Sequence, residues 1–296
     1  MSLTMALTRM LLYCLPRGTG TAEAIHARVQ DRKPAAAIPA DLLRIAHVEE
    51  AVVAGCRVVR LVSKTGASGT TVIYLPGGAY VGPILSVHWR MLATLIRSTG
   101  ATFVVTLYGL APEHTAVDAY ALLDTVYAGV DAAQAGPLFL AGDSAGGALA
   151  LGMAQRLRDA GAPPPTGVIL ISPWLDATMR NPEVPALAGR DPMLGAAGLI
   201  EAGRMWAGEL DPRSPLVSPL FGDLAYLPPV VTYQGGRDLF APDAKVLIRG
   251  IVAAGGTARL YFYPSAFHVF PAASWTPEAR RALRSIGRVI RQESSD

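Results

Sequence analysis

Short runs of apolar and β-branched residues alternate along this chain with longer segments whose apolar residues recur at helical spacing. Such alternation is typical of a mostly parallel sheet with helices on both faces. The predicted strands are an antiparallel pair within Val48 to Ser63, followed by Thr70 to Leu75, Thr102 to Leu107, Leu138 to Ala141, Val168 to Ser172, Val230 to Gln234 and Ala258 to Tyr263. We therefore predict an α/β fold on an eight-stranded, mostly parallel sheet.

Helical spacing fills most of the stretches between these strands. The predicted helices are His88 to Ser98, Ala116 to Ala133, Ala145 to Asp159, Pro242 to Ala254 and Pro277 to Gln292. Two segments fall outside the alternation: residues 1–45, with an amphipathic helix around Met10 to Leu15, and residues 179–216, helical around Leu199 to Gly208. We predict a single domain over residues 1–296, with these two segments as a helical cap on a core of residues 46–178 and 217–296.

The composition excludes several classes of protein. Hydrophobic residues make up 51% of the chain and charged residues only 17%, which is too apolar for intrinsic disorder. The net charge is +3 with no basic run longer than a pair, so nothing favours nucleic acid as a partner. No run approaches the roughly 18 apolar residues that suggest a membrane span. Cys14 and Cys56 are too few for a disulfide framework, and we expect a cytoplasmic protein.

The sequence also gives no sign of a metal or an organic cofactor. No two histidines or carboxylates share a helix face at metal-ligand spacing, and neither a dinucleotide-binding fingerprint nor a nucleotide phosphate-binding loop is present. We therefore expect neither a metal nor a cofactor.

Residues Gly142 to Gly146 read Gly-Asp-Ser-Ala-Gly, at the point where an apolar strand gives way to a predicted helix. The Gly-x-Ser-x-Gly pattern in this context is typical of a nucleophilic serine on a sharp turn. Small residues two positions before and after Ser144 leave room for the neighbouring strand and helix. The following helix N-terminus favours negative charge at the same place. Ser144 is the candidate nucleophile.

A second glycine-rich loop, Pro76 to Tyr80, follows the strand Thr70 to Leu75. Acyl transfer needs backbone N–H groups that point at the developing alkoxide, and glycines let the chain approach a substrate closely enough to supply them. On its own, a tight turn explains this loop equally well.

Together these motifs resemble the hormone-sensitive-lipase-like branch of the α/β-hydrolases, the bacterial family IV esterases and lipases. Gly142 to Gly147 matches the family's Gly-Asp-Ser-Ala-Gly-Gly in full, and Pro76 to Ala79 and Tyr108 to His114 are similar to its His-Gly-Gly-Gly and Tyr-Arg-Leu-Ala-Pro-Glu-His blocks. Further family blocks are similar to Ile171 to Asp176 and Ser218 to Phe221. The resemblance implies an α/β-hydrolase fold and an oxyanion hole at Gly77, Gly78, Ala79 and Ala145, with N–H donors on the last three.

Three positions depart from the family pattern: Pro76 replaces a histidine, Ala79 a glycine and Gly109 an arginine. Pro76 lacks an N–H and an imidazole, which predicts looser oxyanion geometry. The alanine is a mild change if the φ angle of Ala79 is negative.

The chain order of an α/β-hydrolase triad is serine, acid, histidine, with the last two on loops after the final strands. Asp238 follows Val230 to Gln234, and His268 follows Ala258 to Tyr263. Asp243 is the rival acid, but we expect it in the first turn of the next helix, where a carboxylate complements the helix dipole. We predict Asp238 as the acid that orients His268, and a structural role for His114.

The predicted function is hydrolysis of carboxylic esters through an acyl-enzyme on Ser144; the family resemblance implies short to medium acyl chains. The same triad would serve an amidase, lactonase or deacetylase, and a non-catalytic binding protein is the other alternative. Partners are a small ester and, through an exposed apolar cap, a second copy in a homodimer. Among Met10, Leu11, Leu12, Met205 and Trp206, packing is favoured over a role in the acyl pocket.

Overall fold

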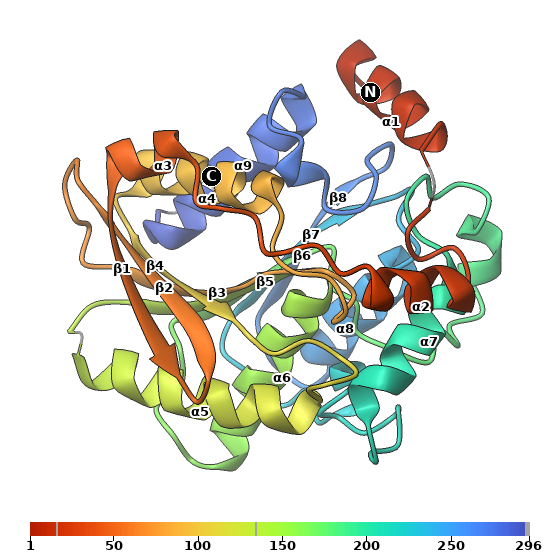
Figure 1. Cartoon of the computed structure of the whole chain (residues 1–296). Coiled ribbons are helices and arrows are strands. Elements are labelled where there is room, and N and C mark those ends of the chain that lie inside the picture. The colour runs from red at the N-terminus through yellow and green to blue at the C-terminus, as the bar shows by residue number, and fades with distance from the viewer. Residues whose placement is uncertain (16, 134, 294–296) are drawn as a thin grey trace.

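A single twisted sheet of eight strands crosses the molecule in the order β1-β2-β4-β3-β5-β6-β7-β8 (Figure 1). The computed structural model describes residues 1–15, 17–133 and 135–293. The strands are β1 (Ala46–Val53), β2 (Cys56–Ser63), β3 (Thr71–Leu75), β4 (Thr102–Leu107), β5 (Leu138–Asp143), β6 (Gly167–Ile171), β7 (Val230–Gly235) and β8 (Ala258–Tyr263).

The strand β2 pairs antiparallel with β1 and with β4, and all the other neighbours run parallel. This confirms the predicted eight-stranded, mostly parallel sheet with its antiparallel opening pair. Within β3, Ile73 and Leu75 face one hydrophobic core while Val72 and Tyr74 face the other, and all four are buried. Both faces of the strand are covered, which is why it reads as a continuous apolar run.

Helices cover both faces of the sheet. The helices are α1 (Leu3–Tyr13), α2 (Ala22–Gln30), α3 (Ala40–Ile45), α4 (Ser86–Thr99), α5 (Ala116–Ala133), α6 (Ala145–Asp159), α7 (Ala196–Ala207), α8 (Ala241–Ala253) and α9 (Pro277–Ile290), with short 3₁₀ turns at Val184–Leu187, Pro219–Phe221 and Phe270–Ala272. One core contains side chains of α5, α6 and α8, and the other contains side chains of α3, α4 and α9.

The helices of the segments outside the alternation pack against different neighbours. Helices α2 and α7 lie side by side, while α1 contacts α9 and α3 contacts α4 (Figure 1). The helix α1 overlaps the helix predicted around Met10 to Leu15 but begins at Leu3, where the Ser2 hydroxyl caps it by accepting a hydrogen bond from the Met5 N–H. The Glu278 carboxylate holds Ser2 in turn, accepting from its backbone N–H and its hydroxyl at 2.6 Å each.

The carboxyl ends of β5, β7 and β8 lead into the loops that carry Ser144, Asp238 and His268. Because these strands run parallel, the three loops meet at one edge of the sheet. No helix within residues 1–15, 17–133 or 135–293 combines the length and the apolar composition needed to cross a bilayer.

Candidate active site

Ser144 lies on a sharp turn between β5 and α6, with φ +53° and ψ −122°. Its backbone N–H donates to the Ile171 carbonyl, and its own carbonyl accepts from the Trp174 N–H, both at 2.9 Å. A Cβ on Gly142 would overlap the Gly146 carbonyl, and one on Gly146 would overlap the Leu75 carbonyl. The turn therefore requires glycine at both positions, and it presents the Ser144 hydroxyl above the end of the sheet.

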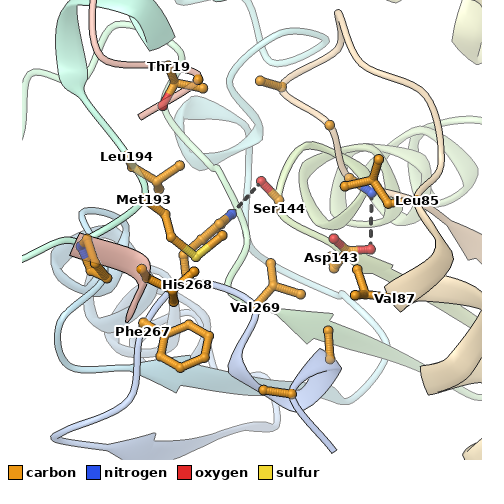
Figure 2. A pocket seen from close by; sticks show the side chains of 18 of the residues that line it. Thr19, Leu85, Val87, Asp143, Ser144, Met193, Leu194, Phe267, His268 and Val269 are labelled. Atoms are coloured by element: carbon orange, nitrogen blue, oxygen red, sulfur yellow. Dashed lines mark hydrogen bonds between the residues drawn. The ribbon is translucent and has the colours of Figure 1, made fainter. Parts of the chain in front are cut away.

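The three predicted triad residues form one series of hydrogen bonds. The Ser144 Oγ lies 2.9 Å from His268 Nε2, and His268 Nδ1 lies 3.0 Å from Asp238 Oδ2 (Figure 2). Asp238 is completely buried, and its other oxygen accepts from the Phe240 N–H at 2.9 Å. Since an ionised carboxylate only accepts, we assign the ring proton to Nδ1, which leaves Nε2 free to take the serine proton.

Electrostatics favour a proton on His268 once it has been accepted. Burial lowers the pKa of the imidazole, but the charge and hydrogen bond of Asp238, together with the charges of Asp191 and Asp143, raise that pKa above its ordinary value overall. The site thus stabilises the imidazolium that forms when Ser144 loses its proton.

Asp243 does not contact this series. It lies in the first turn of α8, where its Oδ1 accepts from the Asn181 side-chain amide at 2.7 Å and its Oδ2 is buried without a hydrogen-bond partner. Burial raises the pKa of Asp243 to about 6. The structure thus brings Asp238, and not Asp243, to His268.

A further buried acid, Asp191, supports the site from outside the triad. Its Oδ1 accepts from the N–H groups of Met193 and Leu194 at 2.8 and 2.9 Å, and its Oδ2 accepts from the Leu239 N–H at 2.9 Å. Burial, followed by the nearby charge of Asp238, raises the pKa of Asp191. Asp191 thus connects the segment before α7 to the loop that carries Asp238 by hydrogen bonds.

In the loop after β3, Gly77 and the expected N–H donors differ in their hydrogen bonding. The Gly77 N–H donates to Asp143 Oδ1 at 3.0 Å, so it is already engaged and cannot serve an oxyanion. In the part of the chain that the structure describes, the N–H groups of Gly78, Ala79 and Ala145 make no hydrogen bond. Ala145 opens α6, where the first N–H groups of a helix have no partner within it.

The replacement of the family glycine by Ala79 would be a mild change only with a negative φ angle, and the structure shows a positive one. Ala79 has φ +56° and the next residue, Tyr80, has φ +63°, so both lie in the left-handed region. For an L-residue this conformation costs roughly 1–2 kcal/mol. The family glycine would avoid that strain, which the packing around the loop sustains instead.

A buried hydrogen-bond network anchors the same loop from below. Asp143 accepts from the Tyr74 hydroxyl and the Gly77 N–H, and its Oδ2 lies 3.2 Å from His88 Nε2. The Leu85 N–H donates to His88 Nδ1 at 2.9 Å, so the ring proton is on Nε2 and points at Asp143. Burial opposes the charge on Asp143, but His88 and these hydrogen bonds lower its pKa overall.

The block from Tyr108 to His114 holds the other side of the loop, where Pro76 replaces the family histidine. The Tyr108 hydroxyl donates to the Pro76 carbonyl at 2.7 Å, and the Ala111 N–H donates to the Tyr80 carbonyl at 2.9 Å. A Cβ at Gly109 would overlap the His114 ring, so a glycine there accommodates the imidazole.

A pocket of about 380 Å³ opens above Ser144. Figure 2 shows Met193 and Leu194 near His268, with Phe267 and Val269 below and Val87 on the far side of Ser144. Of the five residues weighed for the acyl pocket, Leu12 lines it, whereas Met10 and Leu11 are exposed. Within the described residues, no three His, Cys, Asp or Glu side chains gather in an arrangement that could hold a metal ion.

Comparison with known proteins places this arrangement in a family. Residues 72–272 match the α/β-hydrolase fold family. The chain belongs to that family. An acetyl-hydrolase of Streptomyces hygroscopicus is 32% identical over 239 residues, which are 77% of this chain and 77% of that protein.

Solved structures of esterases support the assignment of this α/β-hydrolase to the hormone-sensitive-lipase branch. An esterase/lipase from an uncultured bacterium superposes with a TM-score of 0.82 at 27% identity, covering 99% of both chains. An esterase of the bacterial hormone-sensitive lipase family superposes with a TM-score of 0.80 at 26% identity, again over 99% of both chains. The predicted family and fold are confirmed.

In this α/β-hydrolase an aromatic stack connects α7 to the histidine. Trp206 stacks on Tyr80 with ring centroids 4.2 Å apart, and Tyr80 packs against Trp174 at 5.3 Å. Trp174 stacks on Phe240, whose ring meets the His268 imidazole edge-on at 5.1 Å. Trp206 is therefore a packing residue, as favoured from the sequence, and its packing extends to the site.

Proposed function

We propose that this α/β-hydrolase cleaves carboxylic esters through an acyl-enzyme on Ser144. The Ser144 Oγ attacks the carbonyl carbon while its proton passes to His268 Nε2. The bond to the alcohol oxygen then breaks, and His268 returns the proton to the leaving alkoxide. Water attacks the acyl-enzyme in the same way, its proton passing through His268 to Ser144 as the carboxylic acid leaves.

The observation that carries the proposal is the series Ser144–His268–Asp238, with distances of 2.9 and 3.0 Å, next to N–H groups without acceptors. We propose Gly78, Ala79 and Ala145 as the oxyanion donors. Loss of one such donor typically costs about 2.7–4 kcal/mol of transition-state stabilisation. These donors come after Pro76 in the chain, so its missing N–H does not remove them.

The pocket supports short to medium acyl chains. Its volume of about 380 Å³ is near the lower end of small-molecule sites, and most of its lining is apolar. The name of one relative, an acetyl-hydrolase, agrees with the short end of this range. Residues 1–45 and 179–216 are our proposal for the cap that bounds this pocket, and the cytoplasmic location and the homodimer stay predictions.

Hydrolysis of p-nitrophenyl esters from acetate to palmitate tests the proposal. We expect wild-type turnover to peak at short acyl chains, and Ser144→Ala to lose at least about 10⁴-fold in kcat. Asp238→Asn should lose about 10⁴-fold, because the wrong histidine tautomer is then favoured. Asp243→Asn is the matched control and should retain most activity.

Three results would contradict the proposed ester hydrolysis through Ser144. Turnover that survives Ser144→Ala would remove the serine mechanism. A folded wild-type protein that binds esters but turns none over would support the non-catalytic binding protein, and turnover of amides or lactones alone would support the other hydrolase alternatives.

A further inference from the structure

The pocket above Ser144 contains a positive charge that the proposed mechanism does not use. Arg28, on α2, contributes to the lining of the same pocket as Ser144 and His268. Its guanidinium packs on the Cα of Gly82, where any added Cβ would overlap it. The Gly82 N–H donates to the Gly78 carbonyl at 2.8 Å, closing the turn that carries the proposed oxyanion donors. Arg28 therefore contacts one end of the turn whose other end is Gly78, a proposed oxyanion donor.

Arg28 is unpaired among the residues that the structure describes. Across residues 1–15, 17–133 and 135–293 its partly buried guanidinium makes no hydrogen bond and no ion pair. Two other arginines with largely buried side chains do have partners: Arg32 donates to the Ala111 carbonyl and to Glu113, and Arg158 donates to backbone carbonyls and Asp159. A partly buried cation is normally paired, since desolvation costs free energy that only a partner offsets.

The acids around Arg28 are committed elsewhere. On α7, which packs beside α2, Glu201 pairs with His26 at 3.1 Å and with Arg204 at 3.7 Å. Asp143 lines the pocket, but its oxygens accept from Tyr74, Gly77 and His88. Burial lowers the pKa of Arg28, yet a guanidinium stays charged at any working pH. The pocket thus presents an uncompensated positive charge to whatever enters it.

We propose that Arg28 forms a subsite for a carboxylate on the substrate, so that the preferred esters are monoesters carrying a second, ionised carboxyl group a short chain from the reacting carbonyl. The planar guanidinium can donate two parallel hydrogen bonds to such a carboxylate. Thr19, another lining residue, accepts from the Gly195 N–H at 3.2 Å, which leaves its hydroxyl hydrogen available to the same anion. The surrounding apolar wall strengthens this attraction because it excludes water.

The test compares each charged ester with its neutral amide. One pair places the charge on the acyl side: monoethyl glutarate and the ethyl ester of glutaramic acid. The second places it on the alcohol side: the acetyl ester of 4-hydroxybutanoate and that of its amide. We expect wild-type kcat/KM to favour the charged member of one pair, which also assigns the side on which Arg28 binds.

Arg28→Met should lower this charged-to-neutral ratio by about 10- to 100-fold, mainly through KM, because a charge-assisted hydrogen bond is removed. Arg28→Lys should retain part of the preference, since the charge remains but the fork geometry is lost. Arg249→Met removes an exposed arginine on α8, outside this pocket, and is the matched control, with the ratio unchanged. A ratio near one in wild type for both pairs, or a ratio that survives Arg28→Met, would overturn the subsite.

The proposal rests on the proposed ester hydrolysis, and binding separates the two. Calorimetry on Ser144→Ala, with and without Arg28→Met, should show that monoethyl glutarate or the hydroxybutanoate ester binds more tightly than its amide only when Arg28 is present. If the wild type turns over no ester but this difference in binding persists, the hydrolase assignment fails while the carboxylate subsite stands. If neutral esters are turned over but both members of each pair bind equally, the reverse holds.

Discussion

Two adjacent residues of the oxyanion loop, Ala79 and Tyr80, have left-handed backbone conformations that side chains normally avoid. The contacts on either side sustain them: Trp206 stacks on the Tyr80 ring, and the Ala111 N–H holds the Tyr80 carbonyl. Such strain is common at sites where backbone groups must point at a reacting atom. At Ala79 we expect this conformation to direct the proposed donor N–H toward the pocket above Ser144, which the residue lines.

Replacing Ala79 by glycine should therefore stabilise the protein by about 1 kcal/mol, because the left-handed penalty disappears. We expect kcat to remain within a few-fold of wild type, since the N–H donor is unchanged. Urea denaturation measures the first effect and ester turnover the second. Ala54→Gly is the control, because Ala54 has φ +46° in the turn between β1 and β2, far from the site. A large loss of kcat in Ala79→Gly alone would mean that the methyl group itself fixes the donor.

The sequence is informative about single residues where local context decides their place. Ser144 could be predicted because the Gly-x-Ser-x-Gly turn is specified within five residues, and Asp238 and His268 because chain order restricts them to two loops. Arg28 and Asp191 could not, since each acts across the fold: Arg28 reaches Gly82, and Asp191 reaches Leu239. The only signal for Asp191 in the sequence is an acid directly before the apolar residues Pro192 to Leu194. That pattern is common in proteins where the acid has no such role.

At the scale of elements, strands buried on both faces were predicted to within one or two residues at their ends, because sheet burial alone determines their composition. The helices α2 and α3 were not predicted as separate elements, since each is short and depends on neighbours distant in sequence. Long-range packing also decides where α7 lies. Its Trp206 is fully buried between Tyr80 and Tyr108, which couples this helix to the oxyanion loop.

This coupling predicts different results for two substitutions at Trp206. Trp206→Ala should lower the free energy of unfolding by about 3–5 kcal/mol, because a large buried ring is lost. It should also lower kcat, because Tyr80 then loses its stacking partner. Trp206→Phe should stay much closer to wild type in both, since it keeps an aromatic ring and removes the buried indole N–H, which has no hydrogen-bond partner. Urea denaturation and ester kinetics check both; an alanine variant that loses stability but keeps full kcat would contradict the coupling.

Across the whole molecule, the buried titratable groups in and near the site have pKa values shifted in different directions. Asp143 is satisfied by three donors and has a lowered pKa, so it supports folding above its unfolded pKa. Asp191 and Asp243 have raised pKa values, so each favours the folded state when protonated and disfavours it when ionised. His268, with its pKa raised, supports folding below its unfolded pKa and loses that contribution as pH rises through its folded value. Rising pH therefore lowers the free energy of unfolding through all three groups, between about pH 4 and pH 6 for Asp191 and Asp243 and above the ordinary histidine pKa of 6.5 for His268.

We accordingly expect the free energy of unfolding to fall as pH rises from 5 to 8. For Asp243 the folded pKa is about 6 against an ordinary 3.8, which corresponds to a loss on the order of 3 kcal/mol between strongly acidic pH and pH 8, of which roughly half falls above pH 5. Asp243→Asn should remove this share, because an amide stays neutral while its oxygen still accepts from Asn181. The variant should then be more stable than wild type at pH 8, with a flatter profile. Asp41→Asn, at an exposed position on α3, is the control. Urea denaturation at several pH values measures the free energy of unfolding of each variant. If that free energy depends on pH in the same way in wild type and in Asp243→Asn, ionisation of Asp243 does not destabilise the fold.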